Sequence, residues 1–117
     1  MSSIRDNAAA SRDTNAERVR VPEWDDTELE FRPVTVKKRA DLLKNASVDG
    51  EVDMVLFGPS LLIASVYDPE TGDPAFADGD VDMLSELPAG LVDRLAAVAM
   101  RISGMTVDAV ESGKGDS

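Results

Sequence analysis

The residues best suited to chemistry lie in an acidic run, Tyr67–Leu84, which reads YDPETGDPAFADGDVDML and carries six carboxylates. Carboxylates this close together can bind a divalent cation or act as the acid and base of a hydrolase. They can also turn the chain and start a helix, because Asp side chains accept hydrogen bonds from nearby backbone amides.

An EF-hand calcium loop does not fit this run. A loop that begins at Asp78 matches at Asp80 and Asp82. Met83, however, stands where the loop needs glycine, and Ala89 stands where it needs glutamate. A hydrolase pair needs two acids in a shaped cleft, whereas these acids cluster at turn residues and at the start of a helical pattern. The run therefore predicts a turn and a helix start, without a metal or catalytic site.

The turn has a local origin in three residue types. Asp68 can bond the backbone two residues on, Pro69 presets φ, and Gly72 supplies a left-handed residue. Asp78 or Asp80 is then expected to cap the next helix, where a carboxylate also complements the helix dipole.

Composition argues against several classes of function. The 117 residues carry a net charge of −11, which disfavours binding to nucleic acid or to an anionic membrane. The chain has no Cys and no His, so thiolate chemistry and the commonest general base are missing. No P-loop or dinucleotide-binding glycine motif is present. We therefore expect a non-enzymatic protein that uses no metal and no cofactor.

Two alternating segments predict a β-hairpin over residues 18–32. Val19 and Val21 alternate with arginines, and Leu29 and Phe31 alternate with charged residues, which is the period of half-buried strands. Because an isolated hairpin is marginally stable in water, this one is expected to pack against helices.

Helical patterns follow the hairpin. Thr35 is a suitable N-cap for a helix that ends near Ala46, with a predicted apolar face of Val36, Ala40, Leu43 and Ala46. A second helix is predicted to begin near Pro59 and to run to Val66, because proline is tolerated in a first turn. Residues 51–57 fit either a helix or a strand, and the β-branched content of Leu61–Tyr67 also allows a strand.

The last third of the chain has the strongest helical pattern. A helix is predicted from Pro88 to Ser103, followed by the stop residue Gly104. A shorter helix precedes it, and a weak last turn is expected over 106–112. The apolar positions of the two helices are Val81, Leu84, Leu87, Leu91, Val92, Leu95, Val98, Ala99 and Ile102.

These elements predict an α+β fold, in which an N-terminal β-hairpin packs on three to four α-helices and the C-terminal half is mostly helical. The expected organisation is one domain, 18–110, between a flexible N-terminal tail, 1–17, and a flexible C-terminal tail, 111–117. Both tails are poor in large apolar residues, so they are expected to be disordered.

The order of the pieces resembles the tail assembly chaperones of long, non-contractile-tailed bacteriophages. The resemblance covers residues 18–111 and rests on VRVPEW, on a second strand that ends in RPVTVKKRADLL, and on LLIASVYDPETGDPAFADGDVDML followed by a long helix that ends in SGM. The chain departs from the family at Ala77, where such chains often carry Ser or Thr before the acidic helix start.

The resemblance implies a non-enzymatic chaperone that binds the tape measure protein and keeps it soluble while tail tube protein polymerises around it. It implies action in the host cell cytoplasm and absence from the mature virion. Many family members are made in two forms by a ribosomal frameshift, and the longer form recruits tail tube subunits. Gly113-Lys114 can be encoded by a slippery run, although a flexible tail explains these residues equally well. Weak self-association is also compatible with the family.

The residues proposed to contact the partner are Leu84, Leu87, Leu91 and Met105, near the junction of the last two helices. They fit equally well as core residues. Two other functions stay open: a structural tail or head–tail connector component, which would be found in virions, and an acidic DNA mimic.

Overall fold

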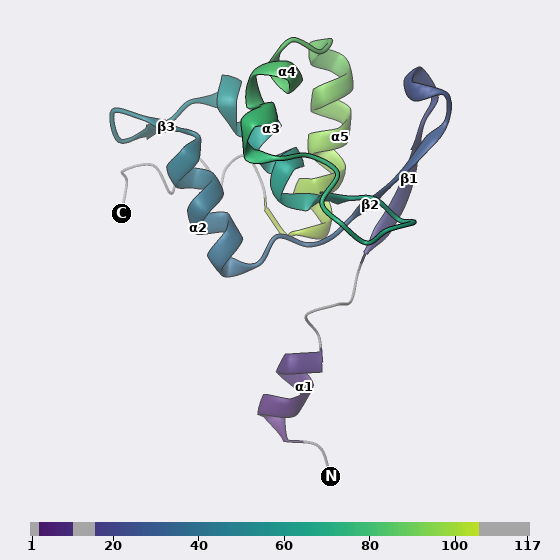
Figure 1. Ribbon diagram of the computed structural model, residues 1–117. Coiled ribbons are helices and arrows are strands. Elements are labelled where there is room, and N and C mark those ends of the chain that lie inside the picture. The colour runs from purple at the N-terminus through teal and green to yellow at the C-terminus, as the bar shows by residue number, and fades with distance from the viewer. Residues whose placement is uncertain (1–2, 11–15, 106–117) are drawn as a thin grey trace.

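The computed structural model describes residues 3–10 and 16–105 and confirms an α+β fold (Figure 1). In chain order its elements are α1 (Ile4–Ala10), β1 (Glu17–Val21), the 3-10 turn η2 (Pro22–Trp24), β2 (Thr27–Phe31), α2 (Val36–Asn45), β3 (Ser47–Val48), β4 (Glu51–Val52), α3 (Met54–Ser65), β5 (Val66–Tyr67), the 3-10 turn η3 (Asp78–Asp80), α4 (Val81–Ser85) and α5 (Ala89–Ile102). The predicted last turn and C-terminal tail lie outside the described residues.

The predicted hairpin is confirmed and begins at Glu17. Strands β1 and β2 are antiparallel, with Val19 opposite Leu29. Asp25 and Asp26 turn the chain in left-handed conformations, with φ of 53° and 57°. Asp tolerates these angles because its short side chain can bond the local backbone.

A third strand, β5, joins the hairpin to give a sheet of order β1-β2-β5. The helix predicted to reach Val66 ends at Ser65, and the strand alternative for 61–67 is right only for the last two residues. The pairing is tertiary, because Val66 lies opposite Phe31 and the N–H of Arg32 donates to the carbonyl of Ser65 at 2.9 Å.

Helix α3 begins at Met54, so the prediction of a start near Pro59 was wrong. The Asp53 side chain caps the helix by accepting from the N–H of Val55 at 2.8 Å, and Pro59 lies inside the helix. The open segment 51–57 is therefore divided between strand β4 and the first turn of α3. Burial outweighs the cost of the internal proline, since the buried side chains of α3 are Phe57, Pro59, Ser60, Leu61, Leu62 and Ser65.

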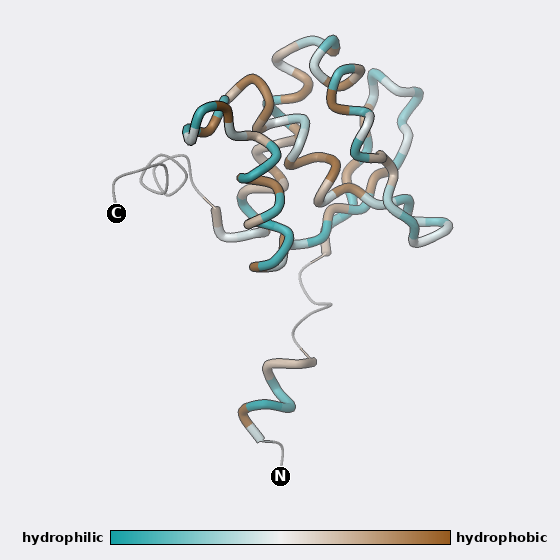
Figure 2. The backbone as a smooth tube through the Cα atoms, turned by 60° about the vertical axis from the view of Figure 1, so that its left-hand side comes forward, coloured by the Kyte–Doolittle hydropathy of each residue, from teal (hydrophilic) through white to brown (hydrophobic). Residues whose placement is uncertain are grey.

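Helix α2 has the predicted cap but a different buried face. The Thr35 hydroxyl accepts from the N–H of Lys38 at 3.1 Å. Only Leu42 within the helix is buried, while Val36 is 76% exposed. The predicted face was therefore wrong at Val36 and Ala40, which are both exposed. Helix α2 is mostly hydrophilic (Figure 2), and Leu42 and Leu43 in its C-terminal half make its core contacts.

Helix α5 and the core around it are as predicted. The helix is preceded by Pro88 and ends at Ile102, before Gly104 with φ of 68°. Helix α3 packs against α2, α4 and α5, and Gly58 allows a close approach, since a Cβ there would lie 3.3 Å from Val92 Cγ1. The most deeply buried apolar side chains are Val21, Phe31, Ala46, Leu61, Leu62, Val66, Leu84, Leu95 and Ala99.

Two ion pairs hold the hairpin against α5. Arg94 donates to Glu23 at 2.8 Å, and Arg101 donates to Glu17 at 2.5 Å. The hydrogen bond from Arg94 lowers the pKa of Glu23 below its ordinary value of 4.5. The same two contacts raise the pKa of Arg94 and of Arg101.

Helix α1 was not expected, because residues 1–17 were predicted to be a flexible tail. The N–H of Asp6 donates to the Ser3 hydroxyl at 3.0 Å, which caps an alanine-rich segment of high helix propensity. None of its residues is buried, so α1 adds nothing to the core. The predicted domain boundaries stay a prediction.

Truncation of Leu95 is expected to lower the free energy of unfolding. Its side chain is 1% exposed between α5 and the rest of the core. Leu95→Ala leaves a cavity and should cost about 2–5 kcal/mol. The matched control Val55→Ala removes a side chain that is 70% exposed and should change stability by less than about 0.5 kcal/mol. Urea denaturation measures both, and equal losses would contradict the assigned core.

The attachment of the hairpin to α5 should depend on pH. Because the folded-state pKa of Glu23 is lowered, its ion pair stabilises the fold at neutral pH, and this contribution is lost as pH falls through the folded pKa. In Arg94→Gln, an NMR titration should show the pKa of Glu23 returning towards 4.5. The control Arg20→Gln removes an exposed arginine that pairs with no described residue and should leave the pKa of Glu23 unchanged.

Candidate partner-binding surfaces

The acidic run forms the predicted turn. The Asp68 carboxylate accepts from the N–H of Glu70 at 2.8 Å, and the Asp68 carbonyl accepts from the N–H of Gly72 at 2.8 Å. Gly72 has a φ of 78°, as the sequence predicted. The N–H of Asp68 donates to the carbonyl of Asp73 at 2.8 Å, and this hydrogen bond closes the loop. The first half of the run is thus a hydrogen-bonded turn.

The second half of the run starts the next helices, as predicted, but the predicted cap is not made. Asp80 lies at the N-cap of α4 without a side-chain cap hydrogen bond, and Ala77 precedes η3. The Asp80 carboxylate accepts from the N–H of Ala77 at 2.8 Å. The reciprocal bond of a capping box is missing, because the alanine side chain has no acceptor. With alanine at position 77, the helix start therefore lacks one hydrogen bond of a full capping box and stays in place.

The described part of the chain contains no candidate metal centre and no helix that could span a membrane. Within residues 3–10 and 16–105, the acidic side chains form no group of three or more that could hold a metal ion. Within the same residues, every helix is too short or too polar to cross a bilayer.

The four predicted contact residues lie in or against the core. Leu84, Leu91 and Met105 are buried, and Leu87 is half-buried against the same cluster. Leu84, Leu87 and Leu91 come together at the junction of α4 and α5 as packing residues in this conformation, whereas Met105 lies beyond the opposite end of α5. Their contact with a partner stays a prediction, and it would require these side chains to become accessible.

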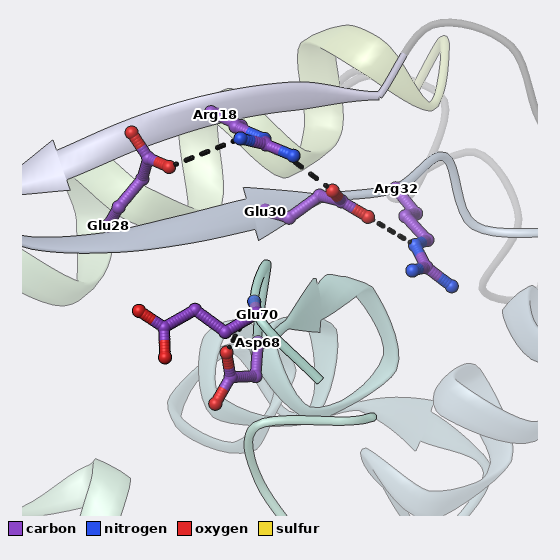
Figure 3. A network of polar contacts seen from close by, with 6 residues as sticks. All are labelled: Arg18, Glu28, Glu30, Arg32, Asp68 and Glu70. Atoms are coloured by element: carbon purple, nitrogen blue, oxygen red, sulfur yellow. Dashed lines mark hydrogen bonds and ion pairs between the residues drawn. The ribbon is translucent and has the colours of Figure 1, made fainter. Parts of the chain in front are cut away.

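One surface groove lies between the hairpin and the acidic turn and has a volume of about 690 Å³. Figure 3 shows the ion pairs on and beside its sheet wall: Arg18 bridges Glu28 and Glu30, and Glu30, outside the lining, also accepts from Arg32 at 2.6 Å. Asp68 and Glu70 lie below this chain of ion pairs, on the acidic turn. Arg18 is paired with Glu28, whereas Arg20 pairs with no described residue. Four carboxylates line the groove against these two arginines, Asp26, Glu28, Asp68 and Glu70, so the groove offers mainly carboxylates.

A second groove, called here the α2 groove, has a volume of about 850 Å³. Helix α2 forms one wall, α3 forms the floor, and the segment 74–81 forms the other wall. Its lining residues are Lys38, Asp41, Leu42, Lys44, Asn45, Ser60, Ile63, Ala64, Pro74, Phe76, Ala77, Asp78 and Val81. No local sequence pattern marks this groove, because its walls come from segments far apart in the chain.

Tyr67 connects the sheet to α2 beside this groove. The Arg32 guanidinium lies 4.1 Å from the centre of the Tyr67 ring, and the Lys38 ammonium lies 4.9 Å from it. Lys38 also donates to the Tyr67 hydroxyl. Cations over an aromatic ring are attracted by its negative face, so these contacts hold the first turn of α2 in place. No local sequence signal marks this cluster.

Comparison with known proteins gives one informative result. No protein-family model matches the sequence, and no curated protein matches it either. A solved structure, the tail assembly chaperone of bacteriophage HK97, superposes with a TM-score of 0.60. The chain shares the fold of a phage tail assembly chaperone. The identity is 17%, and the match covers 75% of this chain and 80% of the HK97 chaperone, so the likeness shows the fold alone.

A glycine comparison tests whether the acidic run is built as a turn. Gly72→Ala places a Cβ on a residue with φ of 78° and should cost about 1–2 kcal/mol of stability. The matched control Gly79→Ala has open space around the added Cβ and no positive φ, so it should be neutral or slightly stabilising. Thermal unfolding measures both variants, and an unaffected Gly72→Ala protein would contradict the assigned turn.

Proposed function

We propose that this protein is a non-enzymatic phage tail assembly chaperone that binds the tape measure protein and keeps it soluble. The observation that carries the proposal is the shared fold with the HK97 tail assembly chaperone over 75% of the chain. The order of sequence pieces that resembles the family, from the hairpin to the long helix ending in SGM, supports it independently.

The surface chemistry is consistent with this role. Long amphipathic helices aggregate through their apolar stripes unless another chain covers them. The α2 groove has apolar side chains on its floor and charged side chains on its rims. A net charge of −11 would keep loaded copies of the chaperone apart.

The proposal extends to the second partner of the family. A longer form, made by a frameshift near Gly113-Lys114, would recruit tail tube subunits while the short form coats the tape measure protein. Both forms would act in the host cell cytoplasm and leave before the virion is complete.

Co-expression with the tape measure protein encoded downstream tests the proposal. We expect the tape measure protein to move from the insoluble to the soluble fraction and to co-purify with a tagged copy of this chain. Mass spectrometry of purified virions should detect the tape measure protein and should not detect this chain.

The opposite pair of results would overturn the proposal. If the tape measure protein stays insoluble and unbound, and this chain is abundant in purified virions, the protein is a structural component of the tail. Expression of the tape measure protein with an unrelated acidic protein is the control for a general effect of charge on solubility.

A further inference from the structure

We propose that the α2 groove is the docking site for an amphipathic helix of the partner chain. The apolar stripe of that helix faces the groove floor, one flank carries carboxylates towards α2, and the other carries cations towards Asp78. This inference rests on the proposed function for the identity of the partner, and it adds the site and its recognition chemistry.

The floor of the groove offers apolar surface that the fold leaves half-covered. Ile63 and Ala64 on α3, and Phe76 and Val81 on the opposite wall, are all partly exposed. Ser60, Ile63 and Ala64 recur at helical spacing, so they present one face of α3. Covering this face would remove further apolar surface from water.

The walls of the groove have opposite charge. Among the charged residues of α2, Lys38, Asp41 and Lys44 line the groove, so this wall is net positive. On the segment 74–81, the charged residue that lines the groove is Asp78. The net positive wall selects a partner with carboxylates on the matching flank, and Asp78 selects a cation on the other flank.

The positive wall is available to a partner. Lys44 forms no ion pair with any residue in 3–10 or 16–105. Lys38 already contacts Tyr67, so Lys44 is the groove-lining cation that can pair with an anionic partner flank.

The backbone around the groove favours a helical partner over an extended one. Helices α2 and α3 satisfy their own N–H and C=O groups, and the N–H of Ala75 already donates to Val66 at 3.0 Å. None of the described residues that line the groove belongs to a strand, so a bound segment has to satisfy its own backbone, as a helix does. Helix α2 is ~15 Å long, which matches about three turns of a partner helix.

The first test blocks the floor of the groove. Ala64→Arg inserts a long side chain on α3, and we expect recovery of soluble tape measure protein in the co-expression assay to fall at least tenfold. The matched control Ala97→Arg makes the same change on the exposed side of α5 and should leave recovery unchanged. Circular dichroism and thermal unfolding establish that each variant is folded.

The second test reverses one charge on the wall and does not depend on the first. Lys44→Glu replaces a groove-lining cation, and we expect a threefold to fivefold loss of recovery, because an exposed ion pair contributes little. Lys37→Glu makes the same change on α2 outside the groove lining and should have the smaller effect. This pair keeps the proposal testable if Ala64→Arg does not fold.

The outcomes separate this inference from the proposed function. If wild-type chain does not bind the tape measure protein, the proposed function fails. If wild-type chain binds and the groove variants bind as well as their controls, the function stands and the α2 groove is not the site. If sedimentation shows that Ala64→Arg changes self-association while partner recovery is unchanged, a second copy occupies the groove and the inference is overturned.

Discussion

The structure depends on the burial of helix α3. Six of its residues are buried, and apolar or small side chains point to nearly every side of it. Such a helix is stable only when other elements surround it. Helices α2, α4 and α5 pack directly on α3. The hairpin contributes Val21, Leu29 and Phe31 to the same apolar cluster. With aromatic residues at 4% of the chain, the core relies on close packing of aliphatic side chains, as at Gly58.

Burial of α3 is incomplete along one line, and the α2 groove follows from this. Helix α2 is too polar to cover α3 fully, because its only buried residue is Leu42. The segment that leaves the acidic turn passes on the other side, with Phe76 turned partly inward. The groove between them combines an apolar floor with walls of opposite charge. A single packing constraint thus accounts for both the fold and the groove that we propose as the docking site.

Local patterns predicted the elements whose cause is local. The hairpin follows from two alternating segments, α5 from its apolar stripe between Pro88 and Gly104, and the acidic turn from Asp68 and Gly72. Errors occurred where distant residues decide the outcome. Proline propensity alone predicts a helix start at Pro59. The helix begins at Met54 instead, because burial of its side chains stabilises the longer helix. The same helix ends at Ser65, where the chain begins to pair with β2. In α2, the residue buried against α3 is Leu42, closer to the C-terminal end of the helix than the predicted face.

The sequence by itself determined the class of fold, the charge, the missing Cys and His, and the role of the acidic run, because these depend on residue type and short-range hydrogen bonds. The family resemblance also came from the order of its pieces, and the shared fold agrees with it. Only the tertiary structure decided which apolar residues are surface and which are core. Leu84, Leu91 and Met105 are packed inside, whereas Ile63 and Phe76 remain partly exposed beside Lys44. Helical periodicity marks an apolar face without saying which element covers it, and that depends on how the whole chain packs around α3.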